Sequence, residues 1–387
     1  MNKEMCMLLR TEILKLFYSK FRSFNELQRL TIPEIVKGKN TLIVAPTGAG
    51  KTESAVIPVL NRILEIKENT DSKGILTLYI TPLRALNRDL LSRLYWWCEN
   101  LNISIAVRHG DTPKSERIKQ SKIPPEFLIT TPETLQVLFM GKRIKEHLKA
   151  VRFVIIDELH ELLDDKRGVQ LSLGLERLVN FAGEFQRIAL SATIGDVDLA
   201  AKFIFGNREY SVIKWYEKKK YKIEVIYPHD INKDDEKLAK QLGWHPKIVW
   251  SLRKMKEILN SVRSAIVFVN TREMAELLTS RFKKLYPDLP VEIHHSSLSR
   301  EVRERNEKLL KEGKLKAIIA TSSLELGIDI GHVDVVIQYT SPRQVSRLVQ
   351  RVGRSKHRLE ETSEGYIITL DPDDYAESLG IKNKIGY

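Results

Sequence analysis

The sequence predicts an α/β protein of two domains, each a parallel sheet flanked by helices. Short apolar runs alternate with longer amphipathic segments, a pattern typical of parallel strands joined by crossover helices. The alternation occurs in two series, separated by a basic segment from Lys214 to Lys222. At 387 residues the chain is also too long for one ordinary hydrophobic core. We therefore expect domains at residues 1–208 and 209–387.

Each series supplies a set of strands. In the first domain we predict strands at 41–45, 76–81, 104–108, 127–130, 153–157 and 188–192. In the second domain we predict strands at 222–227, 265–269, 291–294, 317–320, 333–338 and 366–370. Helices are expected at 247–261, 272–286, 299–312 and 343–352, and a loop or lid at Asp230–Trp244. The N-terminal residues mix apolar and charged side chains and predict an amphipathic helix, not a signal peptide or a membrane span.

Composition limits the class of protein further. The chain has 63 Lys and Arg against 50 Asp and Glu, a net charge of +13. Such a balance favours a polyanionic partner, most often nucleic acid, although a solvated basic surface is the alternative. Cys6 and Cys98 are the two cysteines, so neither a disulfide framework nor a cysteine metal site is expected. We expect a cytoplasmic protein that binds no membrane, and the sequence implies no oligomer.

Residues 45–52, Ala-Pro-Thr-Gly-Ala-Gly-Lys-Thr, follow an apolar strand and precede a helical pattern. Glycines in this context let backbone N–H groups surround a phosphate, and the helix N-terminus adds a favourable dipole. Lys51 supplies a charge for the outer phosphates, and the Thr52 hydroxyl can hold Mg²⁺. Asp157 ends a second apolar strand as a further metal-holding group, and Glu158 can orient or deprotonate water. Together the two segments predict nucleoside triphosphate binding and hydrolysis.

Several other strands of the first series end in polar residues: Thr81-Pro82, His109-Gly110, Thr130-Thr131-Pro132 and Ser191-Ala192-Thr193. Open parallel sheets bind ligands at the carboxyl ends of their strands, so these groups should gather at one edge. The second series has no phosphate loop of its own. This difference predicts one nucleotide site, built on the first domain and completed by the second.

The series of motifs resembles that of the superfamily 2 helicases, whose motor consists of two tandem RecA-like domains with an ATP cleft between them. Asp157-Glu158-Leu159-His160-Glu161-Leu162, followed by residues 167–173 and 175–178, is similar to the large helicase-related (Lhr) branch. The resemblance extends from Gln28 to Arg358. It ends shortly before Tyr387, where relatives continue into a winged helix, so we expect a helicase core or a shorter natural form.

The resemblance implies a set of ATP-site residues. Within the N-terminal segment 1–30, Gln28 would read the adenine edge and Phe21 would pack beside the base, although Asn25-Glu26-Leu27 replaces the family's Thr and Pro. Lys51, Asp157, Glu158, Gln350, Arg354 and Arg358 would be catalytic, the two arginines reaching the γ-phosphate. The remaining ATP contacts would come from Thr47, Gly48, Ala49, Gly50, Thr52, Gly327 and Asp329, with Mg²⁺ on Thr52 and Asp157.

The resemblance also implies contacts to consecutive phosphates of a nucleic-acid strand. In the first domain these residues would be Thr81, Pro82, Arg84, Gly110 and Thr131, and in the second Asn270, Arg272, Thr321 and Ser322. His160, Ser191 and Thr193 would couple the nucleotide site to domain movement. His294-His295 lacks further ligands at metal-binding spacing, so we do not expect a metal there.

The implied activity is an ATP-dependent helicase or translocase that moves 3′ to 5′ on single-stranded DNA and separates DNA duplexes or DNA–RNA hybrids. DNA repair is the pathway the family suggests. Two alternatives stay open: a DEAD-box-like local RNA duplex remodeller, and a nucleotide-gated binding module without productive unwinding. Trp96, Trp97 and Trp244 could stack on bases or pack in the core.

Overall fold

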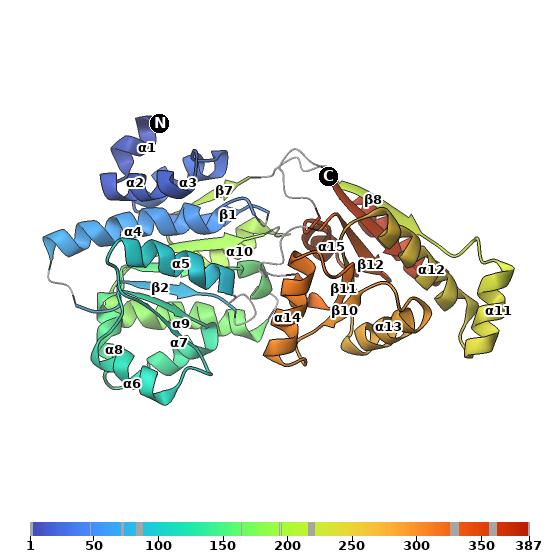
Figure 1. Ribbon diagram of the computed structural model, residues 1–387. Coiled ribbons are helices and arrows are strands. Elements are labelled where there is room, and N and C mark those ends of the chain that lie inside the picture. Colours follow the sequence, from blue (N-terminus) through green and yellow to red (C-terminus); the bar gives the residue numbers. More distant parts are fainter. Residues whose placement is uncertain are drawn as a thin grey trace. The chain divides into compact units, whose positions relative to one another are not determined.

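The computed structural model describes residues 3–46, 48–70, 73–82, 88–163, 165–192, 194, 196–215, 221–325, 333–355 and 362–385. The chain forms two compact units, Met1–Glu217 and Lys218–Tyr387. Each unit is a parallel sheet flanked by helices (Figure 1), so the predicted fold class is confirmed. The units are described separately below.

The sheet of the first unit has the strand order β3-β4-β2-β5-β6-β1-β7. Its strands are β1 (Asn40–Val44), β2 (Thr77–Ile80), β3 (Ile105–Arg108), β4 (Phe127–Thr130), β5 (Phe153–Ile156), β6 (Gln186–Ser191) and β7 (Tyr210–Lys214). Its helices are α1 (Lys3–Leu8), α2 (Thr11–Lys20), α3 (Glu26–Val36), α4 (Lys51–Asn69), α5 (Arg88–Asn100), α6 (Lys114–Lys122), α7 (Pro132–Leu138), α8 (Ile144–His147), α9 (Lys166–Ala182) and α10 (Val197–Phe205). Short 3₁₀ turns cover η2 (Leu148–Ala150) and η3 (Leu159–Glu161).

The sheet of the second unit has the order β10-β11-β9-β12-β13-β8. Its strands are β8 (Tyr221–Ile226), β9 (Ala265–Phe268), β10 (Val291–His294), β11 (Ala317–Ala320), β12 (Val335–Tyr339) and β13 (Ser363–Ile368). Its helices are α11 (Lys233–Leu242), α12 (Pro246–Ser261), α13 (Arg272–Leu285), α14 (Arg300–Lys311), α15 (Val345–Val352) and α16 (Pro372–Asn383), with a 3₁₀ turn η4 (Ser322–Leu324).

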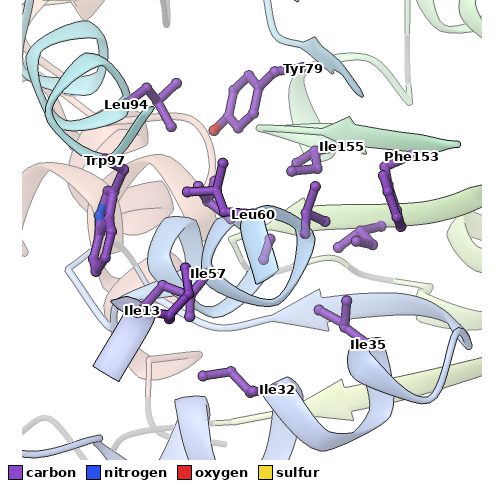
Figure 2. Packing of buried hydrophobic residues seen from close by; sticks show 14 of the residues in the cluster. Ile13, Ile32, Ile35, Ile57, Leu60, Tyr79, Leu94, Trp97, Phe153 and Ile155 are labelled. Carbon is purple, nitrogen blue, oxygen red and sulfur yellow. The ribbon is translucent and has the colours of Figure 1, made fainter. Parts of the chain in front are cut away.

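Both faces of each sheet are buried, which explains why most strands are continuous apolar runs. In β1, Leu42 and Val44 join one hydrophobic cluster of the first unit, while Ile43 belongs to the cluster on the opposite face. Figure 2 shows part of the latter cluster, where α4, α5 and the central strands meet. Trp97 belongs to this core and is 1% exposed, so it is not a surface for base stacking.

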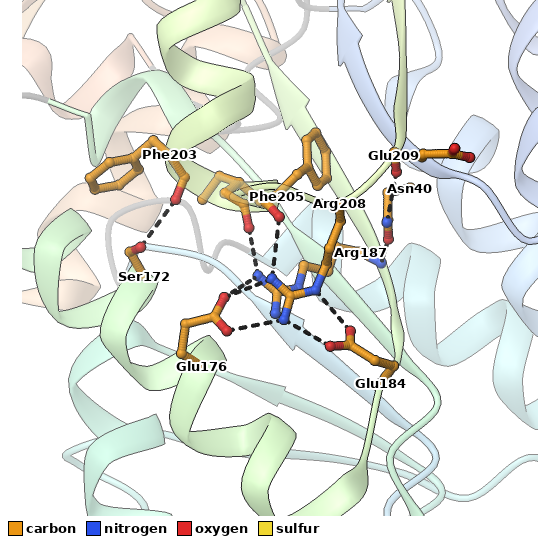
Figure 3. A network of polar contacts seen from close by, with 10 residues as sticks. Asn40, Ser172, Glu176, Glu184, Arg187, Phe203, Phe205, Arg208 and Glu209 are labelled. Atoms are coloured by element: carbon orange, nitrogen blue, oxygen red, sulfur yellow. Dashed lines mark hydrogen bonds and ion pairs between the residues drawn. The ribbon is translucent and has the colours of Figure 1, made fainter.

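Strand β7 extends the first unit beyond residue 208, where the sequence predicts the domain boundary. It pairs with β1 in parallel, Asn40 opposite Tyr210 and Val44 opposite Lys214. The preceding turn is held by a charged network (Figure 3). Arg187 and Arg208 both contact Glu176 at 2.9 Å, and Arg208 also contacts Glu184 at 2.8 Å. The chain therefore completes this additional strand before it leaves the first unit.

The expectation of a loop or lid over Asp230–Trp244 was wrong, because this segment contains α11. Asn232 caps the helix in a reciprocal capping box with Asp235, and Gly243 ends it in the left-handed conformation. Asp235 is buried and pairs with Arg253 of α12 at 2.9 Å. Asp235 and Ala239 are the residues of α11 that are buried, so few apolar positions mark this helix in the sequence. Across the described ranges, no helix combines the length and apolarity that crossing a bilayer requires.

Candidate nucleotide and nucleic-acid site

The described residues Ala45, Pro46 and Gly48–Gly50 connect β1 to α4, as predicted. Gly48 and Gly50 have φ angles of 84° and 85°, a left-handed conformation that disfavours other residues. The Ala45 N–H donates to the Ser191 carbonyl at 3.1 Å, which ties the loop to the end of β6. Lys51 begins α4, and its ammonium donates to the carbonyls of Ala45 and Pro46 at 2.7 and 3.1 Å. The structure therefore has the strand, loop and helix geometry of a phosphate-binding loop.

Asp157 lies directly after β5 and is 7% exposed. Its Oδ2 accepts a hydrogen bond from the Tyr79 hydroxyl, and its Oδ1 accepts one from the Glu158 N–H at 2.9 Å. Burial, reinforced by the charge of Glu158, raises the pKa of Asp157 to about 6. Burial lowers the pKa of Lys51, while Glu158 and Asp157 act in the opposite direction. The lysine and the two carboxylates thus interact within one edge of the first sheet.

Glu158 adopts a left-handed backbone conformation, with φ 51° and ψ 44°. For a residue with a side chain, this conformation costs about 1–2 kcal/mol, and such strain concentrates at functional sites. It places the Glu158 side chain, 15% exposed, 3.5 Å from Nδ1 of His160. The strained residue, Glu158, is the residue that the sequence predicts to orient or deprotonate water.

His160 contacts the end of β6. Its Nδ1 accepts from the Ala192 N–H at 3.3 Å and lies 3.3 Å from the Ser191 hydroxyl. Burial and the charge of Lys51 lower the pKa of His160 to about 4, so the ring is neutral at neutral pH. The approach to Glu158 is therefore not an ion pair. The structure brings together His160 and Ser191 of the predicted coupling group, while Thr193 lies outside the described residues.

The predicted adenine-reading residue lies against the phosphate loop. Gln28 is 4% exposed, and its Oε1 accepts from the Asn25 N–H at 3.1 Å in a capping box at the start of α3. Asn25 Nδ2 donates to the Ala49 carbonyl at 2.9 Å. A Cβ on Gly50 would lie 2.9 Å from Asn25 Nδ2 and 3.1 Å from Gln28 Nε2. Asn25, which departs from the family pattern, thus both caps α3 and holds the loop.

Phe21 is placed differently. It follows α2 and stacks on Phe17, with ring centroids 5.0 Å apart. Its ring is half-buried against the core of the first unit. One face of the Phe21 ring thus already packs against Phe17. The packing of Phe21 beside a base stays a prediction.

A second buried contact joins the nucleotide loop to α5. Glu53, 6% exposed, follows Thr52 in α4 and accepts two hydrogen bonds of 3.0 Å from Arg93. Helix α5 follows the segment 81–87, whose first residues are predicted to contact nucleic acid. The Glu53–Arg93 pair therefore links α4 to α5, the helices that follow the two motifs, and sequence reasoning missed it.

The first-unit residues predicted to contact nucleic acid lie after neighbouring strands. Thr81 and Pro82 are buried after β2, and the Thr81 N–H donates to the Thr130 carbonyl of β4 at 3.0 Å. Thr131 caps α7, accepting from the Thr134 N–H at 3.3 Å. Gly110 is exposed in the turn after β3. Thr47 and Arg84 are outside the part of the chain that the structure describes.

In the second unit, the corresponding residues follow the adjacent strands β9 and β11. Asn270 donates to the Ser341 carbonyl at 2.8 Å, and Arg272 donates to the Ser296 hydroxyl at 2.8 Å. The Thr321 N–H donates to the His294 carbonyl at 3.3 Å, and Ser322 is exposed beside it. Gly327, Asp329 and Arg358 fall in segments that the structure leaves undescribed.

Arg351 of α15 is the centre of a buried polar cluster in the second unit. It is 1% exposed and bonds to Glu325 at 2.5 Å, to the Gln338 Oε1 and to the Asn270 Oδ1 at 3.3 Å. Arg354 donates to the main-chain carbonyl of Glu325 at 2.6 Å. Gln350 is half-buried on the same helix. The predicted finger Arg354 is therefore attached to the segment that begins at Thr321.

Four of these contacts add residues that sequence reasoning did not select. Asn25 carries a readable signal, because Asn followed three residues later by Gln is a capping-box pattern. Tyr79, Arg93 and Arg351 carry no such signal, since each partner lies on a separate element.

Thr52 and Asp157 offer a hydroxyl and a carboxylate, the hard oxygen donors that Mg²⁺ prefers. Their chemistry fits the predicted cation.

Comparison with known proteins agrees with this arrangement. Residues 25–200 match the family model of the DEAD/DEAH box helicases, and residues 250–358 match the helicase conserved C-terminal domain. With the tandem parallel sheets, these matches define the chain as a superfamily 2 helicase core.

The particular branch follows from the relatives. The chain is 39% identical to the ATP-dependent helicase Lhr-Core of Methanothermobacter thermautotrophicus, over 95% of this chain and 44% of that protein. It is 40% identical to the Methanocaldococcus jannaschii Lhr-Core, over 100% of this chain and 46% of that one. The structure of Mycobacterium smegmatis helicase Lhr bound to ssDNA and AMP-PNP has a TM-score of 0.81 and 33% identity, covering 97% of this chain and 50% of that one.

Within superfamily 2, the chain belongs to the Lhr branch, and the predicted resemblance is confirmed. It spans slightly less than half the length of the two Lhr-Core relatives.

Proposed function

We propose that this chain uses ATP hydrolysis to move 3′ to 5′ along single-stranded DNA and to separate DNA duplexes or DNA–RNA hybrids. The observation that carries the proposal is the grouping of Lys51, at the start of α4, with Asp157 and Glu158, which follow β5. Phosphoryl transfer to water requires a cation at the phosphates, a carboxylate that can hold a metal and a group that positions the water, and these three residues can supply them.

We assign the roles as follows. Lys51 and the amides of Gly48 and Gly50 bind the phosphates, and Gln28 recognises adenine. Thr52 and Asp157 would hold Mg²⁺, which would supply positive charge at the phosphates. Glu158 positions the attacking water. Arg354 and Arg358 stabilise the γ-phosphate in the transition state, and Gln350 lies on α15, which ends just before Arg354.

The coupling step uses contacts that are already made. His160 joins the Glu158 turn to the Ser191–Ala192 segment, so a shift at the γ-phosphate displaces the end of β6. Glu53 and Arg93 transmit a shift of α4 to α5, next to the phosphate contacts at Thr81, Pro82 and Arg84. Contacts to phosphates predict binding that is largely independent of base sequence and strongly dependent on salt.

The M. smegmatis Lhr structure is bound to ssDNA and AMP-PNP, which supports a single-stranded DNA track and an adenine nucleotide. The names of the archaeal relatives support ATP-dependent helicase activity. From the family resemblance we also propose a role in DNA repair in the cytoplasm.

The test is strand displacement from duplexes with a 3′ or a 5′ single-stranded tail, in DNA and DNA–RNA form, together with ATPase rates. We expect displacement from 3′-tailed substrates and hydrolysis stimulated by single-stranded DNA. Glu158→Gln should keep ATP binding and lose about 10²–10⁴-fold in rate, the usual contribution of a general base. The matched control Glu161→Gln changes a carboxylate in the same turn and should retain activity.

Other results distinguish the alternatives. Absence of both stimulated hydrolysis and displacement would overturn the proposal. Displacement limited to short RNA duplexes, without dependence on tail polarity, would favour a local RNA remodeller. Tight nucleotide-dependent binding without turnover would favour a gated binding module.

A further inference from the structure

A strongly basic pocket lies at the edge of the first unit, away from the phosphate loop in sequence. Helices α6 and α8 lie side by side (Figure 1). The pocket is a hollow of about 290 Å³ between α6 and Arg143, the residue that precedes α8. None of its seven lining residues is acidic. Five of them are cations: Arg108, Lys114, Arg117, Lys122 and Arg143. We refer to these five residues as the basic pocket.

The innermost cation, Arg108, differs from the other buried arginines. It ends the edge strand β3 and is 9% exposed. Arg187 and Arg351, each 1% exposed, contact a carboxylate within 3 Å. Arg108 instead donates to the Arg117 carbonyl at 3.3 Å. Across the described ranges, none of the basic-pocket residues forms an ion pair. Buried charges are normally paired, so the pocket has the electrostatics of a site for an anion.

Arg117 connects the basic pocket to a predicted strand contact. Its Nη2 donates to the main-chain carbonyls of Gly110 and, at 3.4 Å, His109. Its Nε is buried and has no hydrogen-bond partner among the residues described. The turn at Gly110 is therefore hydrogen-bonded to a residue that lines the pocket. A strand whose phosphate meets Gly110 would bring a neighbouring phosphate to Arg117.

The lining favours a backbone phosphate over a free nucleotide. Arginine forks and lysine ammonium groups match phosphate oxygens. The volume is at the lower limit of ligand pockets, which hold about 300–1,000 Å³. The two uncharged lining residues are Ser121 and Ile118, and Ile118 is 48% exposed. This set contains no aromatic ring or amide to recognise a base, but Ile118 gives apolar surface for a sugar.

We propose that the basic pocket binds a phosphodiester group of the nucleic-acid strand, next to the Gly110 contact. The proposal rests on the proposed function, because it extends the track on which the helicase moves. The pocket lengthens the bound segment on the first unit. It also adds affinity that falls with salt, since each phosphate neutralised on a single strand contributes about 0.7 to the slope of log K against log salt.

The test compares two charge-matched double variants in the full chain. Lys114→Gln with Arg143→Gln removes two exposed cations of the basic pocket. Lys15→Gln with Lys202→Gln removes two exposed cations elsewhere in the same unit. The probe is labelled oligo-dT of increasing length, and anisotropy is measured between about 50 and 200 mM salt, where such slopes are resolved. ATPase without nucleic acid should be the same in both variants.

We expect the pocket variant to lose several-fold in affinity and about 0.7 in salt slope. The loss should occur only with oligonucleotides long enough to pass Gly110. If both double variants bind equally at every length, the pocket proposal is wrong while the helicase proposal stands. A pocket variant that loses equal affinity for the shortest oligonucleotides would also overturn it. If the wild-type chain binds no nucleic acid, the proposed function itself fails.

Discussion

The buried cluster around Arg351 gives the sharpest prediction about the second unit. Arg351→Ala removes the ion pair with Glu325, the hydrogen bonds to Gln338 and Asn270, and the contact with the Phe268 ring, 5.1 Å from the guanidinium. Glu325 is 8% exposed and would be left as a buried carboxylate without its main partner. The change should therefore destabilise the second unit strongly.

The magnitude follows from the burial of both partners. Removing one member of a buried ion pair costs about 3–5 kcal/mol, because the other charge stays desolvated. For a domain of this size, each kcal/mol lowers the melting temperature by about 2–4 °C. We expect the transition of the second unit to fall by roughly 6–20 °C. Replacing both partners, as Arg351→Met with Glu325→Leu, should restore much of this loss.

Differential scanning calorimetry of the full chain measures the effect. Arg347→Ala is the matched control: Arg347 also approaches Glu325, but at 3.9 Å and with 37% of its side chain exposed. It should change stability by about 1 kcal/mol or less. The reasoning is refuted if Arg351→Ala is no more destabilising than Arg347→Ala, or if the double replacement is worse than the single one.

Three further predictions concern the first unit. Tyr79→Phe removes the hydroxyl that donates to Asp157 and should lower the free energy of unfolding in urea by about 1–3 kcal/mol; an unchanged midpoint would contradict this. Gly50→Ala should destabilise the nucleotide-free protein more than Gly48→Ala. Both glycines have φ near 85°, but only a Cβ at position 50 would lie within 3 Å of Asn25. Equal melting temperatures of the two variants would contradict this clash. Hydrogen bonds from Lys39 and Lys37 lower the pKa of Glu34 from 4.5 to about 2, so its stabilisation is complete above pH 4.5 and is lost toward pH 2. Glu34→Gln should flatten that part of the unfolding curve against pH, and a parallel curve would count against it.

The sequence predicts strands best where burial is complete. Phe153–Ile156 and Phe127–Thr130 are apolar at every position or nearly so, because helices cover both faces. Strand β7, Tyr210–Lys214, is half-buried along most of its length and ends in an exposed lysine. Its pairing depends on the open edge of β1 and on the Arg208 network, both of which are tertiary. A local pattern could not identify it.

The same distinction applies to the site. Lys51, Asp157 and Glu158 are predictable because phosphate chemistry requires these residue types after particular strands. The partners that hold them are not predictable in this way. Tyr79 reaches Asp157 from the neighbouring strand β2, and Arg93 reaches Glu53 from α5. Such pairs depend on strand order and helix packing, which one sequence does not specify.

The hydrogen-bond partner of each buried cation indicates whether that cation is structural or available to bind a phosphate. Arg187 and Arg351 contact carboxylates, so a phosphate could bind either guanidinium only by breaking an existing ion pair. Lys51 and Arg108 donate to main-chain carbonyls. A carbonyl is neutral, so replacing it by a phosphate oxygen leaves no unpaired anion and gives a stronger, charge-assisted bond. For Lys51 the sequence predicts a bound phosphate, in the loop after β1. Because Arg108 shares its buried position and its neutral partner, the same electrostatic reasoning leads to a phosphate at the basic pocket.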